Sequence, residues 1–124
     1  MSVARISKED LKQRLEGDQA GTLQILDARL KYPYEHSSVR LPGAVRVLAG
    51  AINVAQLARD KELVVYDSDP DEITSSQVAA ELIRQGFRAS ALKGGISEWV
   101  AANFPVESKE PVQGSSPAPG AAKA

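Results

Sequence analysis

Short apolar runs alternate along the chain with stretches in which apolar residues recur at helical spacing. The runs predict five β-strands, at residues 3–6, 23–27, 44–48, 63–66 and 89–92. The run Leu63–Tyr66 is apolar throughout, which is typical of a strand buried on both faces. The helically spaced stretches predict a helix that begins after an N-cap at Ser7, a weak helix at 52–58, a long helix at 74–85 and a last helix at 96–102.

The alternation of strands and helices predicts the fold class. Strands separated by helices favour parallel pairing through right-handed crossovers. We therefore expect an α/β sandwich with a central, mainly parallel five-stranded sheet and helices on both faces. Ligands of such sheets bind beyond the carboxyl ends of the strands. The segments expected at that edge are 27–29, 67–73 and 93–95.

The composition of the chain changes near Glu107. Residues 1–107 are expected to form one domain. Residues 108–124 (SKEPVQGSSPAPGAAKA) contain three prolines and two glycines but little apolar surface. Such a segment cannot bury enough apolar surface to offset the entropy of ordering. We predict that it is a disordered Pro/Ala/Gly/Ser-rich tail.

Charge and cysteine content exclude several classes of function. Fifteen Lys and Arg residues against sixteen Asp and Glu residues give a net charge of −1, so no bulk positive field would attract nucleic acid. No apolar run approaches the ~20 residues that span a bilayer, so we expect no membrane insertion and a cytoplasmic location. The chain has no cysteine and one histidine, which excludes disulfides, thiolate metal sites and a cysteine nucleophile. No cofactor is expected.

Four motifs, in the expected order, resemble those of the rhodanese domain family. They are Ile25–Arg29, Leu41–Val45, Leu63–Tyr66 and a C-terminal stretch made of Leu92–Trp99 and Asn103–Val106. The resemblance covers residues 4–107 and implies a rhodanese-like sandwich. In active members of the family, the residue that follows the third motif is a cysteine, which accepts sulfur from thiosulfate as a persulfide. Here that residue is Asp67.

Asp67 opens an acidic loop between a strand and a helix. The candidate binding residues are Asp67, Ser68, Asp69, Pro70, Asp71, Glu72, Ile73 and Thr74. Backbone N–H groups at a helix N-terminus favour a negative charge. We expect Asp67 to satisfy these groups permanently and to mimic the charge of a modified cysteine without its reactivity. The sequence thus predicts a catalytically inactive binding or regulatory module, whose partner is a protein or a small anionic or sulfur-related ligand.

The acidic loop also admits other interpretations. Asp67-Ser68-Asp69 after an apolar strand resembles the first motif of the haloacid dehalogenase-like phosphotransferases, in which Asp67 would be a nucleophile or a magnesium ligand. The alternative function is therefore a magnesium-requiring hydrolase or phosphotransferase. An EF-hand pattern fails, because Glu72 and Val78 stand where glycine and glutamate are needed, and no metal site is expected. The plain structural interpretation is a solvated loop that caps a helix.

Asp27, Arg29, Arg40 and Gly94 form the predicted rim of the site. Asp27 and Arg29 are expected to fix a strand end through hydrogen bonds and a salt bridge, for which Glu35 is the candidate partner. Arg40 stands where the family has a histidine and could offer a cation to the acidic loop, although a solvated side chain is the plainer expectation. Gly94 and Gly95 should let the backbone turn tightly into the last helix and approach the loop.

Aromatic residues near the same edge have two interpretations. Tyr32 and Tyr34 are candidates for a contact surface, with packing under the loop as the equal alternative. Trp99 is expected to anchor the core. The lone His36 is expected at the surface or at a helix end.

Overall fold

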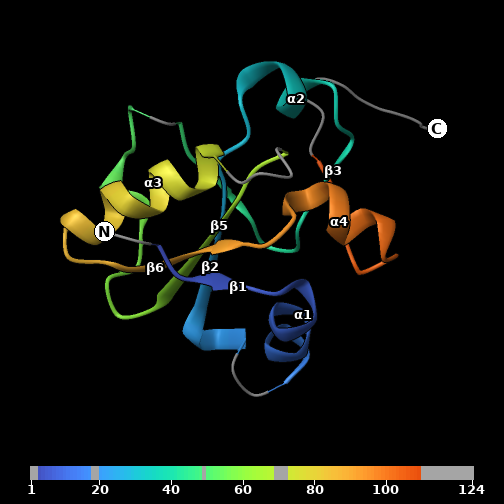
Figure 1. The fold of residues 1–124 in the computed structure, drawn as a ribbon, viewed down its shortest axis with the longest axis horizontal. Helices are drawn as coiled ribbons and strands as arrows, with labels where there is room; N and C mark the ends of the chain where they lie inside the picture. Colours follow the sequence, from blue (N-terminus) through green and yellow to red (C-terminus); the bar gives the residue numbers. More distant parts are fainter. Residues whose placement is uncertain (1–2, 18–19, 49, 69–72, 110–124) are drawn as a thin grey trace.

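The computed structural model describes residues 3–17, 20–48, 50–68 and 73–109 (Figure 1). Its main element is a five-stranded sheet with the strand order β1-β6-β5-β2-β4, in which every described pair is parallel. The strands are β1 (Arg5–Ile6), β2 (Leu23–Asp27), β4 (Val45–Arg46), β5 (Glu62–Tyr66) and β6 (Arg88–Leu92). The predicted α/β class, with a parallel five-stranded sheet, is confirmed.

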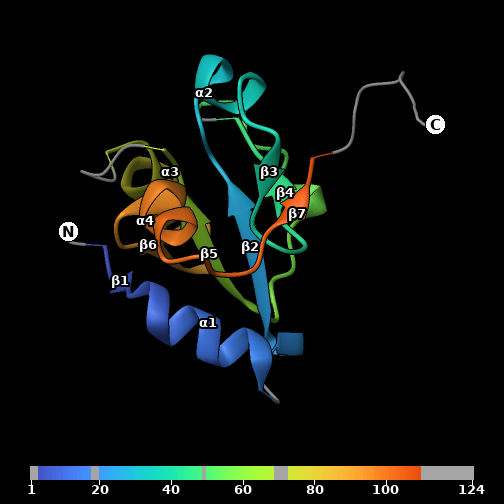
Figure 2. The same cartoon turned by 90° about the vertical axis from the view of Figure 1, so that its right-hand side faces the viewer.

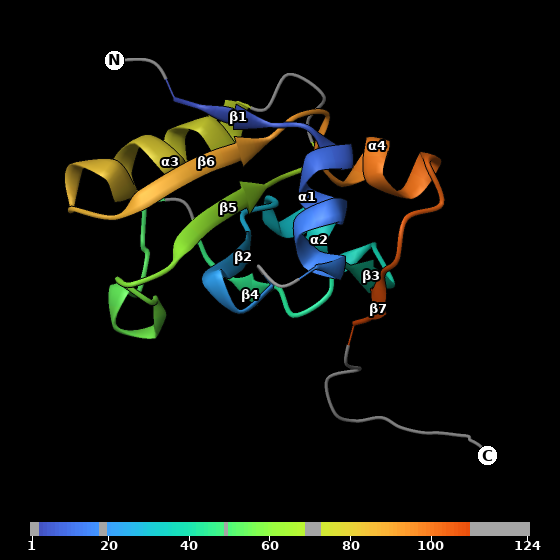
Figure 3. The same ribbon diagram turned by 90° about the horizontal axis from the view of Figure 1, so that it is seen from below.

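Helices cover both faces of this sheet. The covering helices are α1 (Lys8–Glu16), α3 (Ile73–Arg84) and α4 (Gly95–Ala101), and a short helix α2 (Lys31–Glu35), which has no buried residue, follows β2. Figure 3 shows α3 on one face and α1 and α4 on the other. Because side chains of a strand alternate between faces, Val64 of β5 packs with Leu11 and Trp99, whereas Val65 packs with Leu82 of α3. Trp99 is fully buried, as the sequence predicts.

A second, two-stranded sheet lies beside the first. It pairs β3 (Val39–Arg40) with β7 (Glu107–Ser108) in an antiparallel ladder, visible in Figure 2. The backbone N–H of Lys109 donates to the carbonyl of Ser38 at 2.9 Å. Ser108 and Lys109 therefore pair with the domain, although the sequence analysis assigned them to the tail. The remainder of that predicted tail, 110–124, lies outside the described residues.

Several predicted elements differ from those observed. The strand predicted at 44–48 is reduced to β4, a two-residue edge strand, and the helix predicted at 52–58 is one 3₁₀ turn at Val54–Gln56. The helix α2 was not predicted, since it contains Pro33. Proline is tolerated there because it lies in the first turn, where its missing N–H costs no helical bond. His36 ends α2, in agreement with its predicted helix-end position.

The N-terminal helix follows its sequence signals. Ser7 caps α1, and its hydroxyl accepts from the N–H of Asp10 at 3.1 Å. Gly17 ends the helix. In the described part of the chain, no helix is long and apolar enough to span a membrane.

The packing of α3 makes a prediction about stability. Leu82 is fully buried against the sheet, so Leu82→Ala should lower the free energy of unfolding by about 2–4 kcal/mol, measured by urea denaturation. Val100 on α4 is 45% exposed, and Val100→Ala is the matched control, with a loss below about 1 kcal/mol. Equal losses in the two variants would contradict the arrangement described for α3.

Candidate functional site

Asp67 follows β5 directly and lies inside the protein. Its side chain is 1% exposed, and Oδ2 accepts a hydrogen bond from the backbone N–H of Ser75 at 2.6 Å. Ser75 is the third residue of α3, so its N–H is one of the helix-terminal donors without a partner inside the helix. The carboxylate of Asp67 thus caps α3 and places a negative charge at the positive end of the helix dipole.

The backbone of Asp67 is held from the opposite side by α4. Its carbonyl oxygen accepts from the N–H of Ile96 at 2.9 Å. Gly94 and Gly95 precede this contact with φ values of +78° and +63°. A Cβ on Gly95 would lie far inside van der Waals contact of the Asp67 carbonyl oxygen. The structure therefore has the tight turn that the sequence predicts at Gly94 and Gly95. This turn also approaches the backbone of Asp67 closely, as expected.

Asp27 and Arg29 form a buried ion pair at the neighbouring strand end. They are 1% and 2% exposed, and Nη2 of Arg29 lies 2.7 Å from Oδ2 of Asp27. Nε of Arg29 donates to Oδ1 at 3.0 Å, and Nη2 also donates to the carbonyl of Val39 at 3.0 Å. Burial lowers the pKa of Arg29, but the hydrogen bond and charge of Asp27 outweigh it, so the net shift is upward. The pair fixes the end of β2, as the sequence analysis expected, although the salt bridge joins its two members rather than Glu35.

Tyr66 connects this pair to the strand that leads to Asp67. In the sheet Tyr66 lies opposite Asp27. Its hydroxyl donates to Oδ2 of Asp27 at 2.9 Å and accepts from the N–H of Leu41 at 3.3 Å. Burial, followed by the charge of Asp27, raises the pKa of Tyr66. The phenol is thus held neutral, because its anion would be buried beside a carboxylate.

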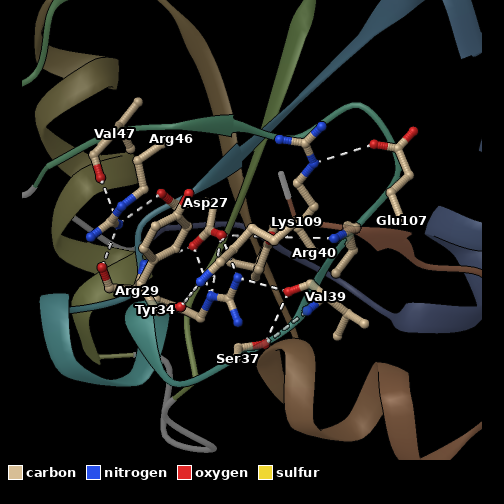
Figure 4. Close-up of polar contacts among 12 residues, drawn as sticks. Asp27, Arg29, Tyr34, Ser37, Val39, Arg40, Arg46, Val47, Glu107 and Lys109 are labelled. Atoms are coloured by element: carbon tan, nitrogen blue, oxygen red, sulfur yellow. Dashed lines mark hydrogen bonds and ion pairs between the residues drawn. The ribbon is translucent and has the colours of Figure 1, made fainter. Parts of the chain in front are cut away.

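Arg40 forms an ion pair with Glu107 and not with a described residue of the acidic loop. Its Nε lies 3.3 Å from Oε1 of Glu107 across the β3–β7 ladder, with both side chains partly exposed (Figure 4). Ser68 is half-buried, and its carbonyl accepts from Ser97 at 3.4 Å. Ile73 and Thr74 begin α3. The predicted loop residues Asp69, Pro70, Asp71 and Glu72 lie outside the described residues.

The sequence analysis missed a cluster of basic side chains at the same edge of the sheet. Arg46 at the end of β4 and Lys109 after β7 meet Arg29 around the ring of Tyr34. Arg46 was expected in the middle of the strand predicted at 44–48 and lies instead at the end of the shorter β4, and nothing in the sequence brings Lys109 there. Within the described ranges, no group of three or more His, Cys, Asp or Glu side chains could hold a metal ion.

The contact between Gly95 and Asp67 can be tested by adding a methyl group. Gly95→Ala should lower the free energy of unfolding by more than about 2 kcal/mol, because the left-handed conformation and a clash with a backbone oxygen both oppose the new Cβ. Gly43→Ala is the control: its φ is +71°, but its Cβ would meet nothing within 4 Å, so only about 1–2 kcal/mol is expected. Equal losses in thermal or urea unfolding would argue against the close approach.

The buried phenol of Tyr66 predicts a fall in stability at high pH. Its pKa is raised in the folded state, so its stabilising contribution is full below the unfolded pKa of about 10 and is lost above it. The free energy of unfolding should decline there by up to about 1.4 kcal/mol per pH unit from this group alone. Tyr66→Phe should be about 1 kcal/mol less stable at pH 7 but should decline less steeply above pH 10. Tyr32→Phe, at a 73% exposed position, should retain the parent slope.

Comparisons with known proteins agree with this geometry. A family model described as Rhodanese-like domain matches residues 7–102. A search of curated proteins finds no match.

Solved structures with this fold include a protein from Lactobacillus plantarum, which is 24% identical with a TM-score of 0.75, over 85% of this chain and 88% of that one. The 3-mercaptopyruvate sulfurtransferase from Leishmania major is 15% identical with a TM-score of 0.70, over 94% of this chain and 39% of its own. The thiosulfate sulfurtransferase from Pseudomonas aeruginosa is 23% identical with a TM-score of 0.69, over 86% and 19%. These likenesses show the fold. Because the family model matches most of its length, the chain belongs to the rhodanese-like domain family.

Proposed function

We propose that this domain is a catalytically inactive binding or regulatory module, in which the carboxylate of Asp67 stands where active relatives carry a reactive sulfur. The observation that carries the proposal is the hydrogen bond of 2.6 Å from the N–H of Ser75 to Oδ2 of Asp67, a side chain that is 1% exposed. The helix terminus that would stabilise a thiolate or persulfide is thereby already engaged by an anion.

The chemistry of the side chain supports the same conclusion. Sulfur transfer needs a thiolate that attacks the sulfane sulfur and then carries it as a persulfide. A carboxylate oxygen is a poor acceptor of sulfane sulfur, and the chain contains no cysteine that could replace it. In this proposal, the domain has the position of a sulfurtransferase nucleophile but lacks the thiol.

The binding edge we propose is the segment Asp67–Ile73 with Thr74. Its sequence carries four carboxylates, at positions 67, 69, 71 and 72. Like charges at this density repel small anions, so we favour a protein partner for this edge over a free anionic ligand. A magnesium-requiring hydrolase is not favoured, because the one described carboxylate of the loop is buried and caps α3. The cytoplasmic location stays a prediction of the sequence.

The proposal is tested by restoring the missing nucleophile. In a thiosulfate-to-cyanide assay, the parent protein should form no more thiocyanate than buffer alone. In Asp67→Cys, the thiolate should attack the outer sulfur of thiosulfate, release sulfite and form a persulfide, which cyanide then converts to thiocyanate and thiolate. We expect turnover, and a mass increase of one sulfur atom before cyanide is added.

Ser68→Cys is the matched control for this experiment. It places a thiol one residue further along, at a half-buried position that is not in the helix-capping position of Asp67. We expect little or no turnover from it. Sulfur transfer by the parent protein would overturn the proposal, as would magnesium-dependent hydrolysis of phosphate esters that is lost in Asp67→Asn. Equal activity of the two cysteine variants would show that the capping position has no special role.

A further inference from the structure

Three basic side chains from separate parts of the chain surround the ring of Tyr34 (Figure 4). The guanidinium carbon of Arg46 lies 4.1 Å from the ring centroid, and Nζ of Lys109 lies 4.0 Å from it. The guanidinium of Arg29 is 5.3 Å away. We call Arg29, Tyr34, Arg46 and Lys109 the Tyr34 cluster. All three cations are within the range of cation–π attraction, which holds them in place without neutralising their charge.

Within the described part of the chain, the Tyr34 cluster holds three cations but one ion-paired carboxylate, while Glu35 acts on Lys109 through its charge without forming an ion pair. Asp27 pairs with Arg29. By contrast, no described carboxylate forms an ion pair with Arg46 or Lys109. Nη1 of Arg46 instead donates to the carbonyls of Asp27, Arg29 and Val47, and Nζ of Lys109 donates to the carbonyl of Tyr34. Burial, followed by the charge of Arg29, lowers the pKa of Lys109.

Several hydrogen-bond donors of the cluster have no partner among the described residues. Nε and Nη2 of Arg29 donate to Asp27 and Val39, whereas Nη1 donates to no described group. Arg46 uses Nη1 alone, and Lys109 uses one of its three N–H groups. Among the described residues, the buried side-chain polar atom that lacks a hydrogen-bond partner is Oγ of Ser90, so the unused donors of the cluster contact solvent. Charged donors of this kind can exchange water for an external acceptor that carries negative charge.

The location of the cluster also suits a ligand. Arg29 lies two residues after β2 and Arg46 is the last residue of β4, so both are at the edge of the sheet at which ligands of parallel α/β folds bind. Tyr34, Arg46 and Lys109 are half-buried, so they are accessible from solvent and yet partly shielded from it. Partial burial strengthens attraction between opposite charges relative to an open surface. Tyr34 and Lys109 contribute neither to the capping of α3 nor to the contact of Asp67 with α4.

We propose that the Tyr34 cluster is a binding site for one oxyanion group, a carboxylate or a phosphate, held by Arg29, Arg46 and Lys109. The anion accepts the unused guanidinium and ammonium N–H groups in charge-assisted hydrogen bonds, the strongest kind available to it. It also neutralises the cations that Asp27 leaves unbalanced. The site is distinct from the acidic loop and stands whether or not Asp67 has the role proposed above.

The test is a titration of the ¹⁵N-labelled protein followed by heteronuclear NMR at pH 7. Sodium phosphate, sodium acetate and sodium chloride are added in separate arms at constant ionic strength. Phosphate or acetate, or both, should cause saturable shifts of the amides of Tyr34, Arg46 and Lys109, whereas chloride should not. The phosphate and acetate arms distinguish phosphate-bearing from carboxylate-bearing ligands.

Variants of Lys109 make this test specific. Lys109→Gln should weaken binding about fivefold, as expected from the loss of one partly screened ionic contact, whereas Lys109→Arg should retain it. Arg40→Gln removes a comparable partly exposed cation whose partner is Glu107, and it should bind like the parent. The spectra themselves report whether each variant is folded.

Three results would overturn the proposal. The first is the absence of saturable shifts at the Tyr34 cluster in both oxyanion arms. The second is binding that Lys109→Gln leaves unchanged, and the third is a set of shifts centred on Ser75 at the N-terminus of α3. None of these results affects the interpretation of the Asp67→Cys assay, which measures sulfur transfer.

Discussion

The buried ion pair of Asp27 and Arg29 connects the carboxyl ends of β2 and β5 with the start of β3. Both side chains are almost completely excluded from solvent, so each charge depends on the other. Removal of one partner of such a pair typically costs about 3–5 kcal/mol, because the other remains buried and unpaired. The same two side chains reach Tyr66 on β5 and the carbonyl of Val39 on β3. One pair thereby sets the position of three strand ends.

Asp67 completes this arrangement with a second buried carboxylate that is balanced differently. Asp27 faces a full cation, whereas Asp67 faces an N–H in the first turn of α3. Partial charges at a helix terminus stabilise an anion less strongly than a guanidinium does, but they are fixed by the backbone and cannot rotate away. An ionised carboxylate in this place caps the helix without any chemical modification. In the function proposed above, a cysteine would do so only as a thiolate or persulfide.

The parts of the molecule that follow local rules could be predicted from the sequence. Leu63–Tyr66 is apolar throughout because its strand is central, and Gly94 and Gly95 follow a strand end, so their approach to Asp67 was predictable. The helix α2 was missed because proline usually marks a break, although the first turn accepts it. Lys109 was missed because the composition of 108–124 describes that segment as a whole. Ser108 and Lys109, at the start of this segment, form backbone pairings with the domain. The average composition of residues 108–124 does not reveal two such local contacts.

Although the net charge of the chain is only −1, its charged residues are distributed unevenly along the sheet edge where ligands would bind. The sequence places four carboxylates after β5, while the ends of β2 and β4 carry two arginines that meet Lys109 around Tyr34. Fields of opposite sign from neighbouring strand ends cancel at long range but not at contact distance. In the functions proposed above, a molecule that binds at this edge is selected by its orientation more than by its total charge, as expected of a module that recognises one arrangement of charges.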